Sequence, residues 1–295
     1  MGSPDFAVPS LKALAAVYPI VGVVTQPDRE AGRGRKLVAP PVKKAALELG
    51  LPVIQPEKLR AAEALAQLQE WAPDLIVVTA FGQILRSAVL DLPRFGCVNV
   101  HGSLLPRWRG AAPIQAAILA GDRETGITIM MMEAGVDTGP MLAQRSIPIG
   151  ADDTARSIFE KMSALGAELL METLPPYLSG TLQPKPQPEE GATYAPMLKK
   201  GDGLLDFTHP AEELARRVRA FHPWPGTYFE WQGAAMKVHA AHAVEGHAVV
   251  GEHLIHQKFP AVGTAGGLLV LDVVQPAGKK PMPGSAFLAG TEWRN

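Results

Sequence analysis

Apolar and polar residues alternate with two different periods over the first two-thirds of the chain. Runs rich in β-branched residues have the length of buried strands, and they lie at residues 20–25, 74–81, 97–101 and 127–133. Other stretches repeat apolar positions as amphipathic helices do, and they lie at residues 42–49, 58–71, 112–120 and 154–178. This alternation predicts an α/β fold with a Rossmann-like, doubly wound and mainly parallel sheet. In such sheets, ligands bind beyond the carboxyl ends of the strands.

A different pattern begins near residue 180. Residues 179–196 are rich in proline and lack an apolar period, which predicts an extended, semi-rigid linker. An amphipathic helix is predicted at residues 211–221. Short alternating runs, typical of a small β-barrel, follow at residues 227–231, 235–244, 247–256 and 267–274. We therefore expect a first domain at residues 1–180, a linker at 181–199 and a C-terminal OB-like β-barrel domain at 200–295.

Composition and charge are those of an ordinary globular protein. The 295 residues are 47% apolar and 19% charged, which is enough to bury a core. The chain has no apolar run of about 18 residues and its first residues lack a signal pattern, so we expect a cytoplasmic protein without a membrane span. The net charge of -1 provides no global attraction to polyanions, so a nucleic acid would have to bind local basic clusters. Cys97 is the only cysteine, which excludes an internal disulfide.

Two polar side chains share one face at the end of the predicted strand at residues 97–101. Because side chains alternate along a strand, Asn99 and His101 point to one side and Val98 and Val100 to the other. A lone histidine at a strand end is most often only hydrogen-bonded into its loop. The adjacent amide and the position at a carboxyl end favour a functional interpretation here.

A carboxylate follows the next predicted strand. Asp137 lies between Gly135 and Gly139, and glycines permit a tight turn that approaches a ligand closely. By itself, an aspartate in such a segment is more often a turn former. Together with Asn99 and His101 it suits acyl transfer to an amine, because an amide and an imidazole can donate to an oxyanion while a carboxylate relays protons. The amine is the nucleophile and there is no G-x-S-x-G elbow, so we expect direct transfer without a covalent enzyme intermediate.

These residues belong to longer segments that resemble a known family. Residues 99–115 read NVHGSLLPRWRGAAPIQ and residues 135–139 read GVDTG, and together they are similar to the shared signature of the folate-dependent formyltransferases. The resemblance implies that Asn99, His101 and Asp137 are the catalytic residues. It also implies 10-formyltetrahydrofolate as co-substrate, no metal ion, and a folate site lined by Ser103, Leu104, Leu105 and Pro106.

Further segments resemble those members of the family that formylate methionyl initiator tRNA for translation initiation. These segments are residues 25–36, 107–113, 219–226 and 275–282. His222 departs from the pattern, in which asparagine is expected, and the departure concerns structure more than chemistry. The resemblance implies that methionyl initiator tRNA and a reduced folate are the partners of a monomeric enzyme.

Local basic clusters are available for contacts with tRNA phosphates. Residues 28–44 contain six basic and two acidic side chains, a net charge of +4. From charge alone, a solvated basic loop is an equally good interpretation, whereas in this family the loop is expected to insert into the acceptor arm. The expected tRNA contacts are Arg29, Arg33, Arg35 and Lys36 and, in the second domain, Lys237, Lys279 and Lys280.

Histidines gather in the second domain without predicting a metal site. His239 and His242 have an i,i+3 spacing, which on a strand directs the two rings to opposite faces. No cysteine thiolate or cluster of carboxylates accompanies them to complete a ligand set. We therefore expect no metal ion.

The resemblance begins at the second residue of the chain. In this family the segment GSPDF, here residues 2–6, follows an apolar first strand in the centre of the sheet, and here it follows Met1. Losing four or five buried residues at about 1.5–3 kcal/mol each would rival a whole net stability of about 5–15 kcal/mol. We therefore expect that the first strand is missing from this sequence and that the native protein begins upstream of Met1.

Three other functions stay open at this point. A formyltransferase acting on a small amine, such as glycinamide ribonucleotide or an amino sugar nucleotide, would use the same three side chains but would not need a basic loop and a second domain. A tRNA-binding module with an inactive enzyme domain would not need Asn99, His101 and Asp137. A hydrolase would transfer the formyl group to water.

Overall fold

The computed structural model describes residues 1–31 and 36–293, and it contains two compact units. The first unit comprises Met1–Gly110, Glu124–Pro148 and Phe159–Tyr194. The second comprises Ala111–Arg123, Ile149–Ile158 and Ala195–Asn295.

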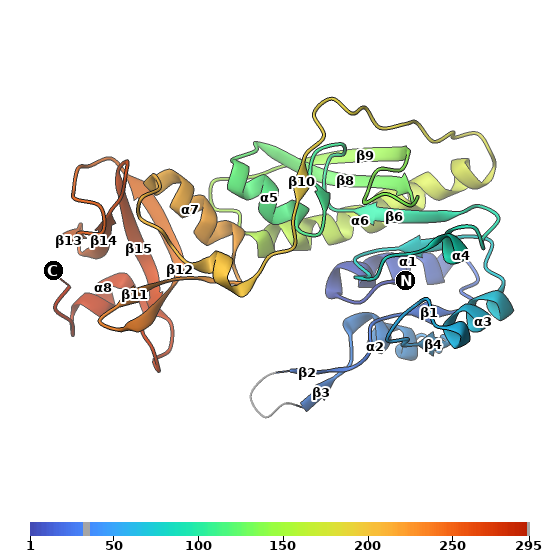
Figure 1. Cartoon of the computed structure of the whole chain (residues 1–295), viewed down its shortest axis with the longest axis horizontal. Helices are drawn as coiled ribbons and strands as arrows, with labels where there is room; N and C mark the ends of the chain where they lie inside the picture. Colours follow the sequence, from blue (N-terminus) through green and yellow to red (C-terminus); the bar gives the residue numbers. More distant parts are fainter. Residues whose placement is uncertain (32–35, 294–295) are drawn as a thin grey trace. The chain divides into compact units, whose positions relative to one another are not determined.

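A four-stranded sheet forms the centre of the first unit (Figure 1). Its strands, in spatial order, are β5 (Ile76–Val78), β6 (Cys97–His101), β8 (Glu124–Met131) and β9 (Met141–Pro148). β5 and β6 run parallel, whereas β8 is antiparallel to both β6 and β9. A separate parallel pair consists of β1 (Val23–Val24) and β4 (Val53–Ile54).

The predicted Rossmann-like α/β fold is confirmed, with parallel pairing in β1–β4 and β5–β6 and antiparallel pairing of β8 with its two neighbours. The strand predicted at residues 127–133 is β8, which pairs antiparallel on both sides. An apolar run specifies burial and not direction, and the return strand β9, which was not predicted, follows after a short connection of the kind that joins antiparallel neighbours.

The remaining elements are short, apart from one long helix that was predicted within a residue of its observed start. The other bounds in this part of the chain are η1 (Asp5–Ala7), α1 (Val8–Val17), β2 (Arg29–Ala31), β3 (Lys36–Val38), α2 (Pro41–Glu48), α3 (Ala62–Trp71), α4 (Ser87–Leu90), β7 (Arg109–Gly110), α6 (Ala155–Leu178) and β10 (Tyr194–Ala195). The helix predicted at residues 58–71 begins at Ala62, because residues 58–61 form a turn in which Ala61 N–H donates to Lys58 O. The helix α1 was not predicted.

The helix α6 packs against the side of the sheet opposite to Asn99 and His101. A Cβ on Gly166 would lie 2.9 Å from Cγ1 of Val100, so glycine permits the close approach of helix and strand. Ser163 Oγ donates to Phe6 O at 3.0 Å, which ties α6 to the start of the chain. The valine face of β6 is therefore structural, and its polar face is left for other contacts.

The first residues of the chain lie between β1 and β5. Gly2 N–H donates to Val24 O at 3.1 Å, and Thr79 N–H donates to Met1 O at 2.9 Å. Beside them lies a mainly apolar cavity of about 490 Å³, whose lining includes Val24 and Ile76. The cavity belongs to the scaffold, since its lining includes none of Asn99, His101 and Asp137. The expectation of an upstream strand stays a prediction.

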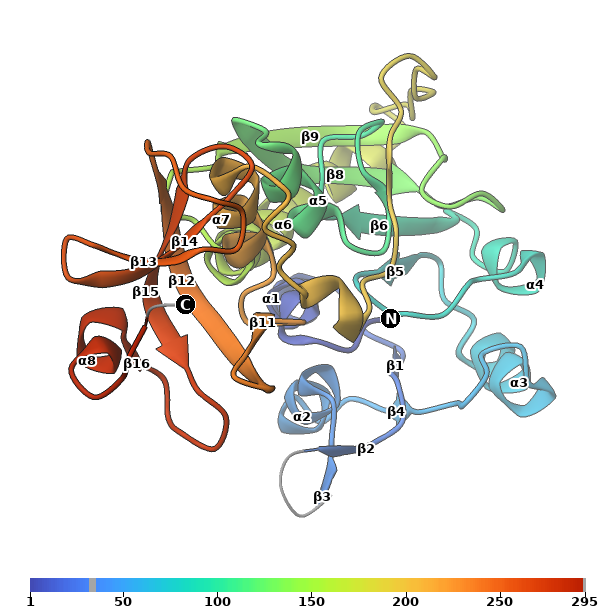
Figure 2. The same ribbon diagram turned by 60° about the vertical axis from the view of Figure 1, so that its left-hand side comes forward.

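An antiparallel sheet dominates the second unit (Figure 2). Its strands pair in the order β11, β12, β15, β14 and β13, and β16 also pairs with β15. Their bounds are Thr227–Trp231 for β11, Ala234–Val244 for β12, His253–His256 for β13, Phe259–Gly263 for β14, Leu268–Gln275 for β15 and Met282–Pro283 for β16. The helical elements are α5 (Pro113–Ala120), η2 (Lys200–Gly203), α7 (Ala211–Ala220) and α8 (Gly284–Leu288). The prediction of a β-rich C-terminal part is confirmed.

Local sequence explains why α7 forms and how it packs. Its apolar side chains at Ala211, Leu214 and Val218 recur with helical spacing and are buried. Acidic residues lie in its first turn and arginines in its last turn, as the helix dipole favours.

Two strands of the second unit differ from the sequence prediction. The run predicted at residues 247–256 is a strand only from His253, and β14 was not predicted.

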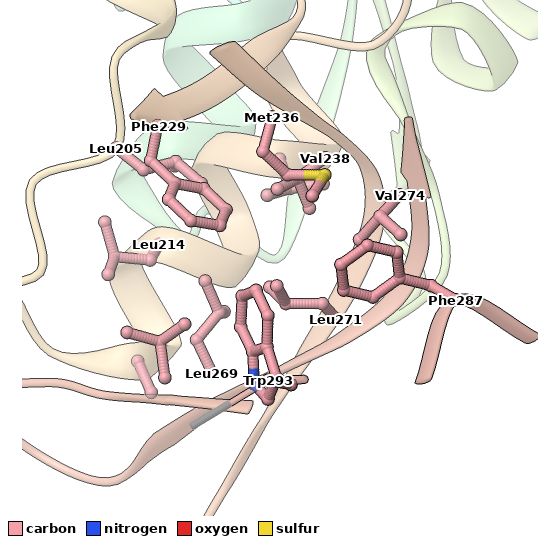
Figure 3. Close-up of a cluster of buried hydrophobic side chains, with 13 residues drawn as sticks. Leu205, Leu214, Phe229, Met236, Val238, Leu269, Leu271, Val274, Phe287 and Trp293 are labelled. Carbon is pink, nitrogen blue, oxygen red and sulfur yellow. The ribbon is translucent and has the colours of Figure 1, made fainter. Parts of the chain in front are cut away.

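Aliphatic and aromatic residues together fill the core between this sheet and its helices (Figure 3). Trp293 is 2% exposed, and its Nε1–H donates to the carbonyl oxygens of Leu254 and Ala261 at 3.0 and 3.2 Å. The ring of His253 stacks on Trp293 with a centroid distance of 4.3 Å. One residue near the end of the chain thus joins β13 and β14 to the core.

Candidate active site

The carboxyl end of β6 carries two buried polar side chains on one face. Asn99 is 9% exposed and His101 is 6% exposed, and both belong to a strand whose five residues are all buried. The alternation of the strand directs them away from Val100, which lies against α6, as the sequence predicts. A buried amide and a buried imidazole require hydrogen-bond partners, and these come from two separate loops.

A tight turn supplies the first of these partners. The backbone of Asp137 has a φ of 52°, a left-handed conformation that is uncommon for residues other than glycine. A Cβ on Gly139 would lie 2.0 Å from Met131 O, and a Cβ on Gly135 would lie 2.0 Å from Thr138 Oγ1. Glycines at both positions are therefore needed for the turn to close against the end of β8.

The turn brings the carboxylate of Asp137 to the polar face of β6. Asn99 Nδ2 donates to Oδ1 of Asp137 at 3.3 Å, and Gly110 N–H donates to Oδ2 at 2.9 Å. Oδ2 also lies 3.6 Å from Nδ1 of His101. The three side chains that the sequence singled out therefore converge, although 38 residues separate Asn99 from Asp137.

A backbone carbonyl determines the tautomer of His101. Its Nε2 lies 3.0 Å from Trp108 O, and a carbonyl oxygen can only accept, so Nε2 carries a hydrogen. In the neutral ring, Nδ1 is then the basic nitrogen, and it is the one that faces Asp137. The pair can accept one proton on the imidazole and stabilise the resulting charge with the carboxylate.

The loop after β6 is held rigidly by polar contacts. Ser103 Oγ donates to Arg107 O at 2.7 Å, and Gln144 Nε2 donates to Leu105 O at 2.8 Å. Thr128 Oγ1 donates to Ser103 O and accepts from the N–H of Leu105. Within the segment expected to line a folate site, Ser103 and Leu105 are buried while Leu104 and Pro106 are partly exposed.

Sequence reasoning missed the backbone groups that orient the three side chains. Trp108 supplies a carbonyl to His101 and Gly110 supplies an N–H to Asp137. Both lie in the RWRG segment at residues 107–110, which the sequence distinguishes only by its resemblance to the family. Sequence reasoning also missed the side chain of Gln187, which donates to the carbonyl oxygens of Asp137 and Gly139.

The basic stretch at residues 28–44 contains a two-stranded hairpin. Arg29 lies on β2 and Lys36 on β3, both exposed, and the two strands pair antiparallel. Arg33 and Arg35 lie outside the described residues. At the base of the hairpin, the ammonium of Lys43 lies 2.8 Å from the carboxylate of Asp28 and holds the pKa of that carboxyl below its ordinary value. The ammonium of Lys43 is therefore already paired within the protein.

The three lysines predicted in the second domain are exposed, and the structure links two of them. Lys237 on β12 pairs in register with Gln275 on β15. Gln275 Nε2 donates to the carbonyl of Lys279 at 2.9 Å, and Lys280 follows. Nε2 of His239 is hydrogen-bonded to Oε1 of Gln275 at 2.9 Å. The backbone at Lys237 and that at Lys279 therefore both lie next to Gln275.

The cysteine thiol is not set up for covalent catalysis. Burial raises the pKa of the Cys97 thiol to about 12, so it is no nucleophile near neutral pH. Within residues 1–31 and 36–293, no group of three or more histidine, cysteine, aspartate or glutamate side chains is arranged to bind a metal ion. Among the helices of these residues, none has the length and apolarity to cross a membrane.

The chain is similar to known proteins over nearly its whole length. Residues 9–174 match the family described as Formyl transferase, and residues 197–292 match its C-terminal domain. The methionyl-tRNA formyltransferase of Myxococcus xanthus (strain DK1622) is 52% identical over 291 residues, which cover 98% of this chain and 93% of that protein. The methionyl-tRNA formyltransferase of Halorhodospira halophila (strain DSM 244 / SL1) is 52% identical over 299 residues, covering 98% and 94%.

A solved structure supports the same fold. The crystal structure of WlaRD, a sugar 3N-formyl transferase, superimposes with a TM-score of 0.68 at 18% identity, covering 95% of this chain and 97% of that one. Sequence similarity over nearly the whole chain and the shared fold lead to one assignment. The chain belongs to the methionyl-tRNA formyltransferase family.

Proposed function

We propose that this chain transfers the formyl group of 10-formyltetrahydrofolate to the α-amino group of methionyl initiator tRNA, for translation initiation. The observation that carries the proposal is the convergence of Asn99, His101 and Asp137 at the end of β6. Two relatives that are about half identical to the chain are named methionyl-tRNA formyltransferases, and these names support the tRNA acceptor.

Each of the three side chains has a defined role in this reaction. The amide of Asn99 has a second hydrogen beyond the one on Asp137, and we assign it to the formyl oxygen, where negative charge develops. Nδ1 of His101 takes the proton that the amine loses as its nitrogen bonds the formyl carbon. Asp137 stabilises the imidazolium, which returns the proton to the departing folate nitrogen.

The surroundings of the site fit a reduced folate, which supplies the formyl carbon. Leu104 and Pro106 are partly exposed next to the catalytic strand, and Val136 is 58% exposed beside Asp137. Apolar surface of this kind suits a flat ring, while a few polar groups orient it. We assign Leu104 and Pro106 to direct contact with the folate, and the buried Ser103 and Leu105 to holding the loop.

We assign the tRNA contacts to exposed basic residues in two places. In the first place they are the hairpin residues Arg29 and Lys36, with Arg33 and Arg35 next to them in sequence. In the second place they are Lys237, Lys279 and Lys280 around Gln275. Such contacts neutralise phosphates and give an affinity that falls with salt.

The domain organisation follows from these assignments. We propose that residues 1–180 form the catalytic domain, that residues 200–295 bind tRNA, and that residues 181–199 connect the two. We also propose a monomer that acts in the cytoplasm, where charged tRNA and folates are available. Sedimentation of the purified protein would test the monomer directly.

Transfer of labelled formyl from 10-formyltetrahydrofolate tests the proposed function. The acceptors compared are methionyl initiator tRNA, glycinamide ribonucleotide, an amino sugar nucleotide and water alone. We expect kcat/KM for the tRNA to exceed that for either small amine by about 100-fold or more. Equal transfer to a small amine, or release of formate without an acceptor, would replace this proposal by one of the alternatives.

A further inference from the structure

The proline-rich segment after α6 is attached to the catalytic loops. Lys185 and Met141 exchange two backbone hydrogen bonds of 2.8 and 2.7 Å at the start of β9. Thr193 accepts from Arg109 N–H on its carbonyl and from Trp108 N–H on its Oγ1, both at 2.9 Å. The sequence predicts a spacer here, but residues 185–193 are held at both ends by the segments that carry the active site.

Gln187 lies between these two attachments and contacts the catalytic turn. Its Nε2 donates to Asp137 O and to Gly139 O, both at 2.8 Å. Its Oε1 accepts from Nε of Arg109 at 3.1 Å. The orientation of the amide is unambiguous, because a guanidinium only donates and carbonyl oxygens only accept.

The turn that Gln187 contacts is one that needs external support. A left-handed backbone is uncommon at residues other than glycine, and Asp137 adopts it with a φ of 52°. The two carbonyl oxygens that Gln187 holds lie at this residue and two positions beyond it, so they fix the orientation of the turn. Without these two hydrogen bonds, the carboxylate of Asp137 could move away from His101 while the rest of the sheet stays folded.

Two features pre-organise the contact. Pro186 and Pro188 flank Gln187, and a residue before proline is restricted to extended backbone, so little freedom is lost when its side chain binds. Arg109 is 1% exposed. Burial acts to lower the pKa of Arg109, but hydrogen bonds to Tyr194 and Glu189 outweigh it and raise the pKa, so the guanidinium stays charged. A fixed cation therefore orients the amide of Gln187.

We propose that Gln187 is a positioning residue of the transfer reaction, which holds the Asp137 turn so that its carboxylate meets His101 and Asn99, and that Arg109 orients Gln187 for this task. The inference rests on the proposed function and deepens it. It assigns a role in the chemistry to a segment whose sequence predicts only a connection between domains.

The first test compares Gln187→Ala with the matched control Gln183→Ala. Gln183 lies in the same segment, is exposed, and its Nε2 donates to the nearby Gly180 O. We expect Gln187→Ala to lower kcat by about 10–100-fold, as misplacement of a catalytic group by about 1 Å does, with KM for tRNA and folate within about threefold. The control stays within about twofold of wild type. An unchanged kcat in Gln187→Ala would overturn the inference.

A second variant keeps the test valid if the alanine variant folds poorly. Gln187→Glu has nearly the same shape but places carboxylate oxygens against the carbonyls of Asp137 and Gly139, which repel it. We expect a loss of kcat at least as large as for alanine, with a thermal midpoint within about 5 °C of wild type. Wild-type turnover in a folded Gln187→Glu protein would contradict the assigned contact.

A double-mutant cycle separates positioning from a general structural role. If Gln187 acts through Asp137, then Gln187→Ala lowers kcat no further in an Asp137→Asn background. If the two substitutions instead lower kcat by the product of their separate factors, Gln187 acts elsewhere and the inference is overturned. Wild-type protein that fails to formylate methionyl initiator tRNA would instead contradict the proposed function, so the two failures are distinguishable.

Discussion

The catalytic turn at residues 135–139 and the C-terminal core around Trp293 use buried groups in opposite ways. In the turn, a left-handed backbone holds a carboxylate whose oxygens meet an amide, a backbone N–H and an imidazole. In the core, aromatic and aliphatic side chains pack together, and the indole N–H of Trp293 finds backbone acceptors (Figure 3). The first arrangement orients polar atoms and the second removes apolar surface from water. Substitutions should therefore separate turnover from stability.

The largest expected effect is the loss of turnover in the variant Asp137→Asn. Asparagine tolerates the left-handed backbone and has a similar shape, so the turn should persist. The variant lacks the charge that stabilises a protonated His101, and we expect kcat to fall by about 10³-fold. Single-turnover transfer measures this loss, while filter binding of tRNA should show an affinity within about threefold of wild type. A comparable loss of tRNA binding would assign Asp137 to the substrate contact instead.

Removing the central aromatic residue of the core should affect stability and leave the chemistry intact. We expect Trp293→Ala to lower the free energy of unfolding of the second unit by about 3–5 kcal/mol. Urea titration followed by circular dichroism measures it, with Val249→Ala, which is 73% exposed, as the control. The folded fraction of Trp293→Ala should keep its kcat for transfer. A change in kcat as large as that of Asp137→Asn would mean that the two regions are not separable.

The smallest expected effect is a change of stability with pH that depends on His253, whose ring stacks on Trp293. Burial lowers the pKa of His253, so the folded state favours the neutral ring, and the unfolded chain takes up a proton first as pH falls below about 6.5. The stabilisation by neutral His253 is therefore complete above this pH and is lost as pH decreases through the acid range. Because the side chain is partly solvated, we expect a loss of less than about 1 kcal/mol between pH 7 and pH 5.

The substitution His253→Phe tests this assignment, since it keeps the stacked ring without a titrating group. Urea midpoints at pH 7 and pH 5 should differ less in the variant than in wild type. An equal difference in both proteins would assign the acid sensitivity to other groups.

Several features could be predicted from local sequence alone. Alternation along β6 placed Asn99 and His101 on the face away from the packed valines, because the side-chain period of a strand is two. The glycines around Asp137 indicated a close turn, and they are sterically required there. The apolar spacing of α7 predicted its buried face within one residue of its end. In each case, the information lies within a few neighbouring residues.

Tertiary structure decided the rest, because those features depend on residues distant in sequence. The antiparallel direction of β8 could not be predicted from an apolar run, which specifies burial and not direction. The role of Gln187 was hidden in a segment without a period, since its partners are two carbonyl oxygens about 50 residues earlier in the chain. Sequence alone thus determined which chemical groups stand at each strand end and turn. Only the folded chain brought them together, because hydrogen bonds between separate loops depend on geometry that no local pattern encodes.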